Sequence, residues 1–424
     1  MKCEIISVGT ELLMGQTENT NAGALARELF PLGIGVYYQT AVGDNEERLR
    51  GVFSQALQRS ALIILTGGLG PTEDDLTRET VARVLGLPLV KNKEWEKRLK
   101  DFFHRFKRPM AVQNLRQTMV PQGGKILPND RGTAPGIYLD LQAGRGPVVV
   151  LLPGPPSEML PLFREQVLPL LRAKLQEKGD LAILQSKVLR IIGLGESDLS
   201  ERIAVLLKNQ DNPTLAPLAK AGEVHLRITA RGSTAEVVQT LLADKARELR
   251  EILGDYIYGE DEEELELAVA RLLWAKGLTL ALAESCSGGL LSHRLTNVPG
   301  SSDYLLAVLV TYSNAAKMQL LGVEQATLER AGAVSAAVAE QMAAGVRRLC
   351  RADIGVGITG IAGPGGGTPE KPVGLTYLAL EAENFKFSRR YEYWGGRQVV
   401  KERASQTALY LLWLYLRGKL RPKN

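Results

Sequence analysis

The stretch that decides the fold is Ala61-Leu62-Ile63-Ile64-Leu65-Thr66-Gly67-Gly68-Leu69-Gly70-Pro71-Thr72-Glu73-Asp74-Asp75. Its first six residues predict a buried strand, and a helix is expected to begin near Thr77. The glycines Gly67, Gly68 and Gly70 let backbone N–H groups approach an anion at the start of that helix. Asp74 and Asp75 offer oxygens that suit a hard cation such as Mg²⁺, and Thr72 adds a hydroxyl. An Asp-rich helix cap is the plain alternative, but three glycines, a proline and two adjacent aspartates favour a ligand loop.

The segments around this loop alternate between strand-like and helix-like patterns. Strands are predicted at Ile5–Val8, Val36–Ala41, Leu62–Leu65 and Val148–Leu152, and helices at Asn21–Phe30, Glu46–Arg59 and Thr77–Leu85. This alternation predicts a mostly parallel sheet with helices on both faces, whose ligands bind at the carboxyl ends of the strands. Turns carrying Asn21, Asp44 and Gly154 can converge there with the loop, although each alone is typical of a plain turn.

The remaining chain divides into two further patterns. Residues 171–257 combine two alternating strands, Lys187–Ile192 and Glu223–Ala230, with two helices, which predicts a small α+β part. Its Gly193-Leu194-Gly195-Glu196 turn is acidic and lacks the basic GXXG form that clamps single-stranded nucleic acid. Residues 258–424 return to alternating strands and helices. The sequence therefore predicts an α/β protein of three parts, with boundaries at 1–170, 171–257 and 258–424.

A second candidate site lies at Ala283-Glu284-Ser285-Cys286-Ser287-Gly288-Gly289, where a predicted strand ends and a helix begins. A hydroxyl at such a turn is exposed, and the N–H groups after it can stabilise an oxyanion or bind phosphate. Simple helix capping by Ser285 or Ser287 is the alternative. Cys286 is a rival nucleophile, but His293 is the only histidine in this part, so a Cys–His pair has little support.

A serine nucleophile needs a base, and the stretch Thr311-Tyr312-Ser313-Asn314-Ala315-Ala316-Lys317 supplies a candidate. A lysine whose pKa is lowered by burial can accept the serine proton, and Tyr312 can relay the proton or orient the lysine. A surface lysine and a core tyrosine are the plain reading of the same residues. A third feature is the glycine-rich run that starts at Thr359-Gly360, where the backbone can approach a ligand closely or form a mobile loop.

Composition limits the classes of function. The 424 residues carry a net charge of +5, with basic and acidic residues interspersed, so nucleic-acid binding is not expected. Three cysteines without CxxC spacing indicate neither a disulfide framework nor a zinc site, and a reducing cytoplasm fits best. The longest apolar run near the end, Ala408–Leu416, is too short to span a bilayer, and no signal peptide is visible. We expect no membrane association.

The first part resembles the N-terminal domain of the CinA family (competence/damage-inducible protein A). The matching stretches are Val8–Leu13, Asn19–Asn21, Val42–Asn45, Gly67–Asp75 and Leu152–Met159. The resemblance implies a three-layer fold like that of molybdopterin-binding proteins, and a metal-dependent pyrophosphatase that converts ADP-ribose to AMP and ribose 5-phosphate. A divalent metal such as Mg²⁺, held by Asp44, Asp74 or Asp75, would polarise the diphosphate. The middle part resembles the KH-like region of the same family, for which a connecting or dimerising role is favoured over RNA binding.

The last part resembles the C-terminal domain of the family, which also exists as a separate nicotinamide-nucleotide amidase. The resemblance implies hydrolysis of nicotinamide mononucleotide (NMN) to nicotinate mononucleotide and ammonia, without a cofactor. It makes Ser285 the nucleophile, Lys317 the base and Tyr312 its helper, and it places the substrate beside Ser287, Gly288, Thr359 and Gly360. It implies in the first part that Asn21, Gly67, Gly68, Gly70, Thr72 and Gly154 contact the substrate, and it implies a homodimer.

Some positions depart from the family pattern. Ser287 stands where threonine is usual, Gly365 where aspartate is common, and Ala307-Val308 where a glycine precedes the Val-Thr-Tyr strand. A Val308 side chain turned inward would crowd the amidase pocket. Two other readings remain open. One is a nucleotide-binding regulatory protein linked to competence or DNA damage, with one site degenerate. The other is a molybdopterin-handling enzyme, which rests on fold analogy alone.

Overall fold

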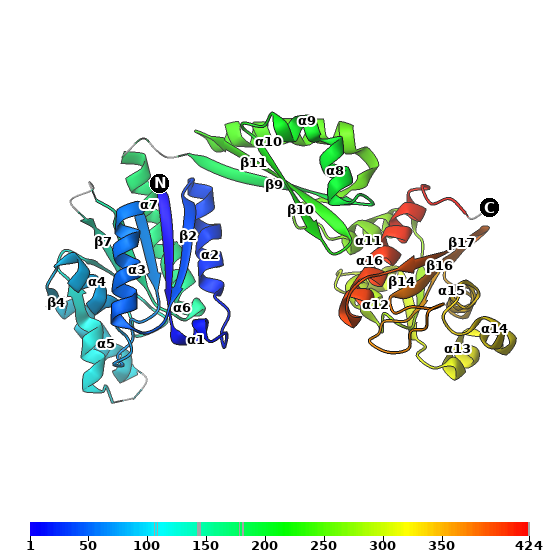
Figure 1. Ribbon diagram of the computed structural model, residues 1–424, viewed down its shortest axis with the longest axis horizontal. Coiled ribbons are helices and arrows are strands. Elements are labelled where there is room, and N and C mark those ends of the chain that lie inside the picture. Colours follow the sequence, from blue (N-terminus) through cyan, green and yellow to red (C-terminus); the bar gives the residue numbers. More distant parts are fainter. Residues whose placement is uncertain (106, 108, 142–145, 178, 180–181, 423–424) are drawn as a thin grey trace. The chain divides into compact units, whose positions relative to one another are not determined.

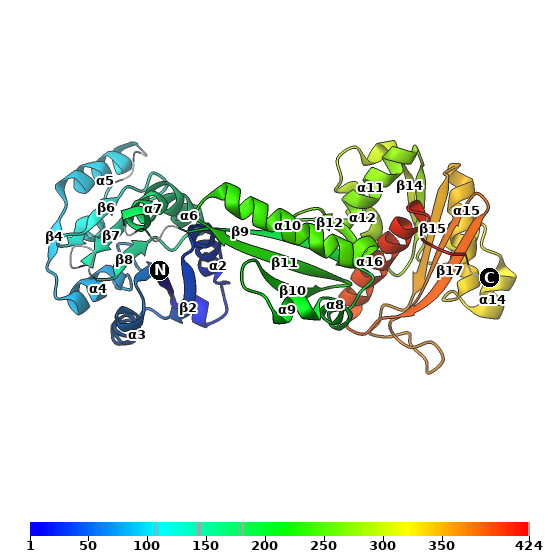
Figure 2. The same cartoon turned by 90° about the horizontal axis from the view of Figure 1, so that it is seen from above.

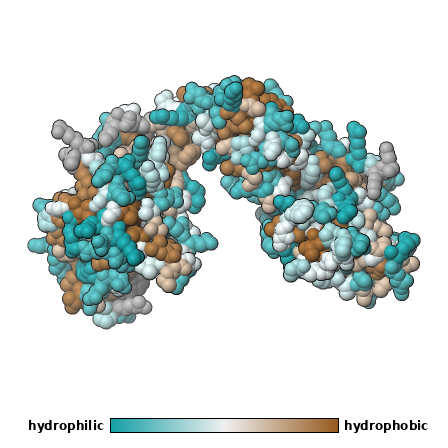
Figure 3. Space-filling view, in the orientation of Figure 1, coloured by the Kyte–Doolittle hydropathy of each residue, from teal (hydrophilic) through white to brown (hydrophobic). Residues whose placement is uncertain are grey.

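The computed structural model describes residues 1–105, 107, 109–141, 146–177, 179 and 182–422. The chain forms two compact units, one of Met1–Gln185 with Ala230–Leu241 and one of Ser186–Thr229 with Leu242–Asn424. Both units are mixed α/β (Figure 1). Over the face shown in Figure 3, hydrophilic and hydrophobic residues are interspersed. Among the described residues, no helix is long and apolar enough to cross a membrane.

The N-terminal unit is built on a six-stranded sheet of order β2-β1-β3-β8-β7-β6. The first four strands of this order are parallel, namely β2 (Gly35–Val42), β1 (Lys2–Val8), β3 (Leu62–Thr66) and β8 (Val148–Leu152). The last two, β7 (Gly136–Asp140) and β6 (Lys125–Leu127), are antiparallel additions at one edge. A separate ribbon pairs β4 (Leu89–Lys91) with β5 (Met119–Pro121). The predicted mostly parallel sheet is confirmed.

Both faces of this sheet are buried, because alternate residues of each strand enter different cores. In β3, Leu62 and Ile64 join a core with α2, α6 and α7, whereas Ile63 and Leu65 join a core with α3 and α4. Figures 1 and 2 show helices on the two faces. The helices are α1 (Thr10–Leu13), α2 (Thr20–Leu29), α3 (Glu46–Arg59), α4 (Thr77–Leu85), α5 (Lys93–Arg105), α6 (Pro156–Leu162) and α7 (Leu168–Glu177). The result is the predicted three-layer arrangement.

The middle segment forms a four-stranded sheet of order β10-β11-β9-β12. Its strands are β9 (Ile183–Ile192), β10 (Thr214–Lys220), β11 (Glu223–Gly232) and β12 (Ile257–Glu260), and its helices are α8 (Glu196–Arg202), α9 (Ala204–Lys208) and α10 (Ala235–Leu253). The sequence pattern identified β9 and β11 but not β10, which contains Pro217. Proline is tolerated there because β10 lies at the edge of the sheet.

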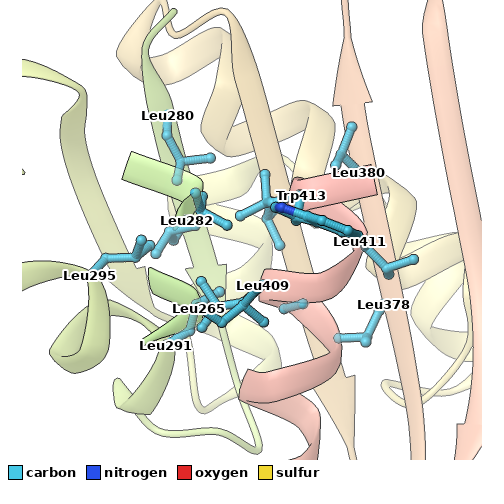
Figure 4. Packing of buried hydrophobic residues seen from close by; sticks show 14 of the residues in the cluster. Leu265, Leu280, Leu282, Leu291, Leu295, Leu378, Leu380, Leu409, Leu411 and Trp413 are labelled. Carbon is cyan, nitrogen blue, oxygen red and sulfur yellow. The ribbon is translucent and has the colours of Figure 1, made fainter. Parts of the chain in front are cut away.

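The C-terminal part contains a five-stranded sheet of order β14-β13-β15-β16-β17. β13 (Leu280–Glu284), β14 (Leu305–Val310) and β15 (Ile354–Gly360) are parallel, whereas β16 (Leu375–Ala382) and β17 (Phe385–Glu392) are antiparallel. One face is covered by α11 (Leu265–Lys276), α12 (Leu290–Thr296) and α16 (Arg397–Leu416). Figure 4 shows leucines of β13 and β16 directed toward side chains of these helices.

The other face is covered by α13 (Asn314–Leu321), α14 (Gln325–Ala331) and α15 (Ala336–Cys350). Helix α15 lies unusually close to β15, because β15 presents glycines to it. A Cβ at Gly355 would overlap the carbonyl oxygen of Ala343, and one at Gly357 would overlap that of Ala339. Because β13, β14 and β15 are parallel, their carboxyl ends lie at one edge of the sheet.

Candidate functional sites

The turn that carries Ser285 is held by the acidic residue before it. Glu284 ends β13 and is fully buried. Its carboxylate accepts hydrogen bonds from the backbone N–H groups of Gly289 (3.0 Å), Leu291 (3.3 Å) and Ser292 (2.9 Å) at the start of α12. Glu284 therefore satisfies donors that a helix N-terminus otherwise leaves free. These three N–H groups are therefore occupied by Glu284 and are not available to an oxyanion or a phosphate, contrary to the expectation from the sequence.

Lys317 and Ser285 meet as the sequence predicted. The Lys317 side chain comes from α13 and is almost completely buried, and its Nζ donates to Ser285 Oγ at 3.2 Å and to the Thr311 carbonyl oxygen at 2.8 Å. Burial lowers the pKa of Lys317, because removal from water disfavours the charged ammonium. A buried lysine in contact with a serine hydroxyl has the geometry of a nucleophile and its base.

Cys286 lies beside Ser285 but has the properties of a structural residue. It is buried, and burial raises the pKa of its thiol to about 11. Because the thiolate is the nucleophilic form, the raised pKa makes this cysteine a weak nucleophile near neutral pH. Its Sγ also packs closely beneath β15, since a Cβ at Gly360 would lie 2.9 Å from it. The turn therefore presents one candidate nucleophile, Ser285.

Tyr312 lies at the rim of this site rather than inside it. Its side chain is 60% exposed, and its hydroxyl accepts a 2.6 Å hydrogen bond from Nη2 of Arg397. Arg397 begins α16 and also donates from Nη1 to the Gly363 carbonyl oxygen at 2.8 Å. Within the described chain, the hydrogen bonds of Tyr312 thus lead to Arg397 and not to Lys317. Sequence reasoning missed Arg397, which lies outside the stretches around Ser285, Lys317 and Thr359.

The other predicted residues of this site lie close by in different roles. Thr359 is buried, and its hydroxyl donates to the Ala333 carbonyl oxygen at 2.8 Å. Ser287 is fully buried, and its Oγ has no hydrogen-bond partner among the described residues. Gly288 faces α16, where Lys401 Nζ lies 3.6 Å from the position of a Cβ on that glycine. Val308 packs against the core formed with α11, α12 and α16.

The second site is a pocket of about 370 Å³ at the carboxyl ends of the strands of the N-terminal sheet. Its walls combine the predicted glycine loop with the turns after β1, β2 and β8 and with the loop before β7. Members of the predicted site that line the pocket are Asp44, Gly67, Gly68, Gly70, Asp74, Asp75 and Gly154. Glu11 and Glu158, which lie in the matching stretches Val8–Leu13 and Leu152–Met159, line it as well, together with Gln117, Thr133 and Ala134. Gln117 is almost fully buried, and its Oε1 meets no partner in the part of the chain that the structure describes.

Two of the predicted residues form hydrogen bonds with the backbone of the turns around this pocket. Asn21 Nδ2 donates to the Gly154 carbonyl oxygen at 2.7 Å, which connects the start of α2 to the turn after β8. Asp44 Oδ2 accepts from the Thr10 N–H at 2.8 Å, while Thr10 Oγ1 accepts from the Asp44 N–H at 3.1 Å. This reciprocal pair joins the turns after β1 and β2. One oxygen of Asp44 is therefore committed to the fold.

The glycine loop is held by hydrogen bonds between its own residues and by hydrogen bonds from Arg116. Asp75 Oδ2 accepts from the N–H of Thr72 at 2.9 Å and from its hydroxyl at 2.5 Å. Arg116 donates to the Thr72 carbonyl oxygen at 2.6 Å, to the Asp75 carbonyl oxygen at 3.5 Å and to Glu79 at 3.2 Å. These hydrogen bonds connect the two ends of the loop and tie it to Arg116. Sequence reasoning missed Arg116, which lies outside any recognisable motif.

A divalent metal fits this donor set only with help from a ligand. Asp44, Asp74 and Glu11 bring carboxylates to one pocket, and hard oxygen donors suit Mg²⁺. Among residues 1–105, 107, 109–141, 146–177, 179 and 182–422, however, no three His, Cys, Asp or Glu side chains gather closely enough to hold a metal. Mg²⁺ is commonly bound by one or two carboxylates together with substrate phosphates and waters, which is the arrangement these residues permit.

The fold and the two sites define a three-part α/β protein, and comparisons with known proteins agree. Residues 4–173 match the description "Probable molybdopterin binding domain", residues 186–259 match "Damage-inducible protein CinA KH domain", and residues 262–416 match "CinA C-terminal domain". The chain belongs to the CinA family of competence/damage-inducible proteins. The boundaries predicted at 170 and 257 stay predictions.

Two full-length relatives support this assignment, and one solved structure is similar to part of the chain. A competence-damage inducible protein of Moorella thermoacetica is 50% identical over 420 residues, which cover 99% of this chain and 100% of the relative. A CinA-like protein of Kosmotoga olearia is 47% identical over 409 residues, or 96% of this chain and 97% of the relative. The crystal structure of the competence/damage inducible protein CihA from Agrobacterium tumefaciens is 42% identical, covers 36% of this chain and 95% of that chain, and has a TM-score of 0.35.

Proposed function

We propose that the C-terminal part is an amidase that hydrolyses NMN to nicotinate mononucleotide and ammonia. The observation that carries this proposal is the 3.2 Å contact between Lys317 Nζ and Ser285 Oγ, in a buried setting that lowers the pKa of the lysine. A neutral Lys317 amine can still donate to the Thr311 carbonyl oxygen while its lone pair accepts the proton of Ser285. The pair therefore supports general-base activation of a serine.

The proposed reaction has two stages. Lys317 takes the Ser285 proton as Oγ bonds to the amide carbon, and the C–N bond then breaks while Lys317 returns the proton to the leaving ammonia. Water hydrolyses the resulting ester, with Lys317 again accepting and returning a proton, and the carboxylate product leaves. Arg397 and Lys401 stand one helical turn apart on α16 near this turn, and their charges suit the 5′-phosphate of a mononucleotide.

Ammonia release from NMN tests the amidase proposal. Ser285→Ala is expected to abolish release, whereas Cys286→Ala is expected to retain it, because the thiol is protonated and buried. Activity that survives Ser285→Ala, or that disappears equally in Cys286→Ala with the fold intact, would contradict the assigned nucleophile. Circular dichroism of both variants provides the control for folding.

We also propose that the N-terminal pocket hydrolyses ADP-ribose to AMP and ribose 5-phosphate with a divalent metal. Support comes from the carboxylates of Asp44 and Asp74, which line the same pocket as the glycine loop. A bound Mg²⁺ would neutralise diphosphate oxygens and lower the pKa of a coordinated water. The residues of the chain bind and orient: Asn21 and Gly154 fix one wall, and Gly67, Gly68 and Gly70 line the pocket.

AMP formation from ADP-ribose, with added Mg²⁺ or with a chelator, tests the second activity. Asp74→Asn is expected to lower the rate at least tenfold, and Glu73→Gln serves as a control, since Glu73 is exposed and does not line the pocket. An equal loss in both variants would contradict the role of Asp74. Tight nucleotide binding without turnover of either substrate would favour a regulatory protein instead.

A further inference from the structure

Helix α16 connects the amidase site with the middle segment. Its first two turns carry Arg397 and Lys401, the cations that lie near the Ser285 turn. The helix ends at Leu416, and its 20 residues correspond to a length of about 30 Å. Its second half contains runs of consecutive buried residues, so neighbouring elements pack against several sides of it. A helix packed in this way is displaced as a unit, and a shift at one position reaches the others.

Two tight turns of the middle sheet fit against α16. Gly193 follows β9, and Gly222 lies in the turn between β10 and β11; their φ angles are +83° and +86°. A Cβ on Gly193 would lie 2.3 Å from the Tyr410 hydroxyl oxygen, and one on Gly222 would lie 3.0 Å from Cγ of Gln406. Because Gln406 and Tyr410 are four residues apart, both turns contact the same face of α16.

Glu223 ties this contact together. Its side chain is 10% exposed, and its carboxylate accepts hydrogen bonds from Gln406 Nε2 at 2.9 Å and from the Tyr258 hydroxyl at 2.7 Å. Burial raises the pKa of Tyr258, as does the Glu223 carboxylate, so the phenol keeps its proton and remains a donor. His225 Nε2 lies 2.6 Å from the other carboxylate oxygen. Gln406 is 6% exposed, so its amide relies on Glu223 rather than on water.

We propose that Glu223 is a positioning residue of the amidase site and that it acts through α16. The inference rests on the proposed amide hydrolysis, and it gives the middle segment a role in recognising the phosphate of the substrate. Glu223 holds Gln406, which follows Arg397 by nine residues, or about 14 Å along the helix axis. A displacement of α16 at Gln406 therefore moves Arg397 and Lys401, whose charges suit the 5′-phosphate.

Two ligands that differ only in the phosphate test the proposal. Gln406→Glu places a second carboxylate against Glu223 and should displace α16, so KM for NMN is expected to rise about fivefold with little change in kcat. Nicotinamide riboside lacks the phosphate, and its inhibition constant against NMN hydrolysis should stay the same. Adding Glu223→Gln restores a carboxylate–amide pair and should return KM for NMN toward its original value. Gln239→Glu, at an exposed position of α10, is the matched control.

A purely structural role of Glu223 predicts a different pattern. Loss of folding would weaken NMN and nicotinamide riboside alike, and that result would overturn the proposal. Equal KM values in Gln406→Glu and Gln239→Glu would overturn it too, as would a double variant that recovers nothing.

Calorimetric titration of NMN into proteins that carry Ser285→Ala separates this inference from the proposed hydrolysis. If the unaltered protein releases no ammonia, but NMN binds about fivefold less tightly after Gln406→Glu and recovers with Glu223→Gln, the positioning role stands and the hydrolytic function falls. If NMN is hydrolysed but binds Gln406→Glu as it binds Gln239→Glu, the positioning role is wrong. Absence of NMN binding in the Ser285→Ala protein would overturn it as well.

Discussion

Arg397 donates a 2.6 Å hydrogen bond to the hydroxyl of Tyr312, although 85 residues separate the two in the sequence. The same guanidinium holds the Gly363 carbonyl oxygen, so it joins the rim tyrosine, the glycine-rich loop and the start of α16. We expect Tyr312→Phe and Arg397→Gln each to lower kcat/KM for NMN. Because they share a bond, the double variant should lose less than the sum of the two, with a coupling of about 0.5–1 kcal/mol. Strictly additive losses in a double-mutant cycle would show that the bond has no role.

The buried amine of Lys317 predicts a particular pH dependence of activity. Burial lowers its pKa, and only the neutral amine can accept the Ser285 proton, so kcat/KM should rise with pH through that lowered value. Lys317→Arg should be inactive at every pH, since a guanidinium remains protonated. A pH profile from 5 to 10, measured by ammonia release, checks both statements. An unchanged profile in a still-active Lys317→Arg protein would contradict the base assignment.

The same shift predicts how stability depends on pH. Between the lowered pKa of Lys317 and the ordinary value of 10.5, the unfolded chain binds a proton that the folded chain does not bind. The contribution of Lys317 to the free energy of unfolding therefore rises with pH across this window, and it is smallest at low pH, where the charged ammonium is buried. Lys317→Met should remove this dependence. Urea unfolding at several pH values compares the two proteins.

Glu284 should matter for folding as well as for the site. Three backbone N–H groups depend on its carboxylate, so Glu284→Gln is expected to lower the free energy of unfolding by about 1–3 kcal/mol. Glu383→Gln, at an exposed position between β16 and β17, should change it by less than about 0.5 kcal/mol. Urea denaturation of both variants makes the comparison. Equal stability would mean that the α12 cap is dispensable.

Arg116 should be needed to hold the glycine loop in its conformation. Arg116→Ala removes donors to two loop carbonyl oxygens, so the loop should lose its fixed shape. We expect AMP formation from ADP-ribose to fall at least tenfold and to need more Mg²⁺, while NMN hydrolysis stays unchanged. Lys125→Ala is the control, because Lys125 is exposed on β6 and outside the pocket. Loss of both activities would instead indicate general unfolding.

The close packing of α15 on β15 predicts that a side chain at Gly357 destabilises the protein. A side chain at Gly365, which lies outside this packing, should be tolerated. Gly357→Ala should destabilise the protein by about 1–3 kcal/mol, because the added carbon overlaps the Ala339 carbonyl oxygen. The added carbon of Gly365→Ala would meet no atom within 4 Å, so this substitution should leave the free energy of unfolding nearly unchanged. Thermal unfolding distinguishes the two, and similar melting temperatures would show that α15 can shift away.

Periodic patterns predicted the parallel sheets because both faces of each strand are buried, which gives continuous apolar runs such as Leu62–Leu65. They missed α5 (Lys93–Arg105), whose sequence is dominated by charged residues around few apolar ones. They also missed β10, since Pro217 is a weak signal for a strand. Local pattern thus identifies elements that supply the core, and it fails for elements that lie at an edge or carry a charged surface.

The candidate sites divide in a similar way. The contact between Ser285 and Lys317 was predicted, because both residues lie in short motifs at strand ends. Arg397 and Arg116 were not, because their contacts depend on how distant segments pack rather than on neighbours in sequence. The residues that perform the proposed chemistry could therefore be predicted from the sequence, whereas the residues that hold them in place could not. The homodimer and the metal stay predictions.

The position of Glu284 also bears on what leaves the site. A bare helix N-terminus attracts carboxylates, and in an amidase it would retain the acid that the reaction creates. Here a buried carboxylate already neutralises the start of α12, one residue from the nucleophile. An uncharged amide can approach this end of the helix without penalty, whereas the newly formed carboxylate finds the N–H donors of Gly289, Leu291 and Ser292 already occupied. For the proposed amide hydrolysis, the group that builds the turn would thus also favour turnover by weakening product inhibition.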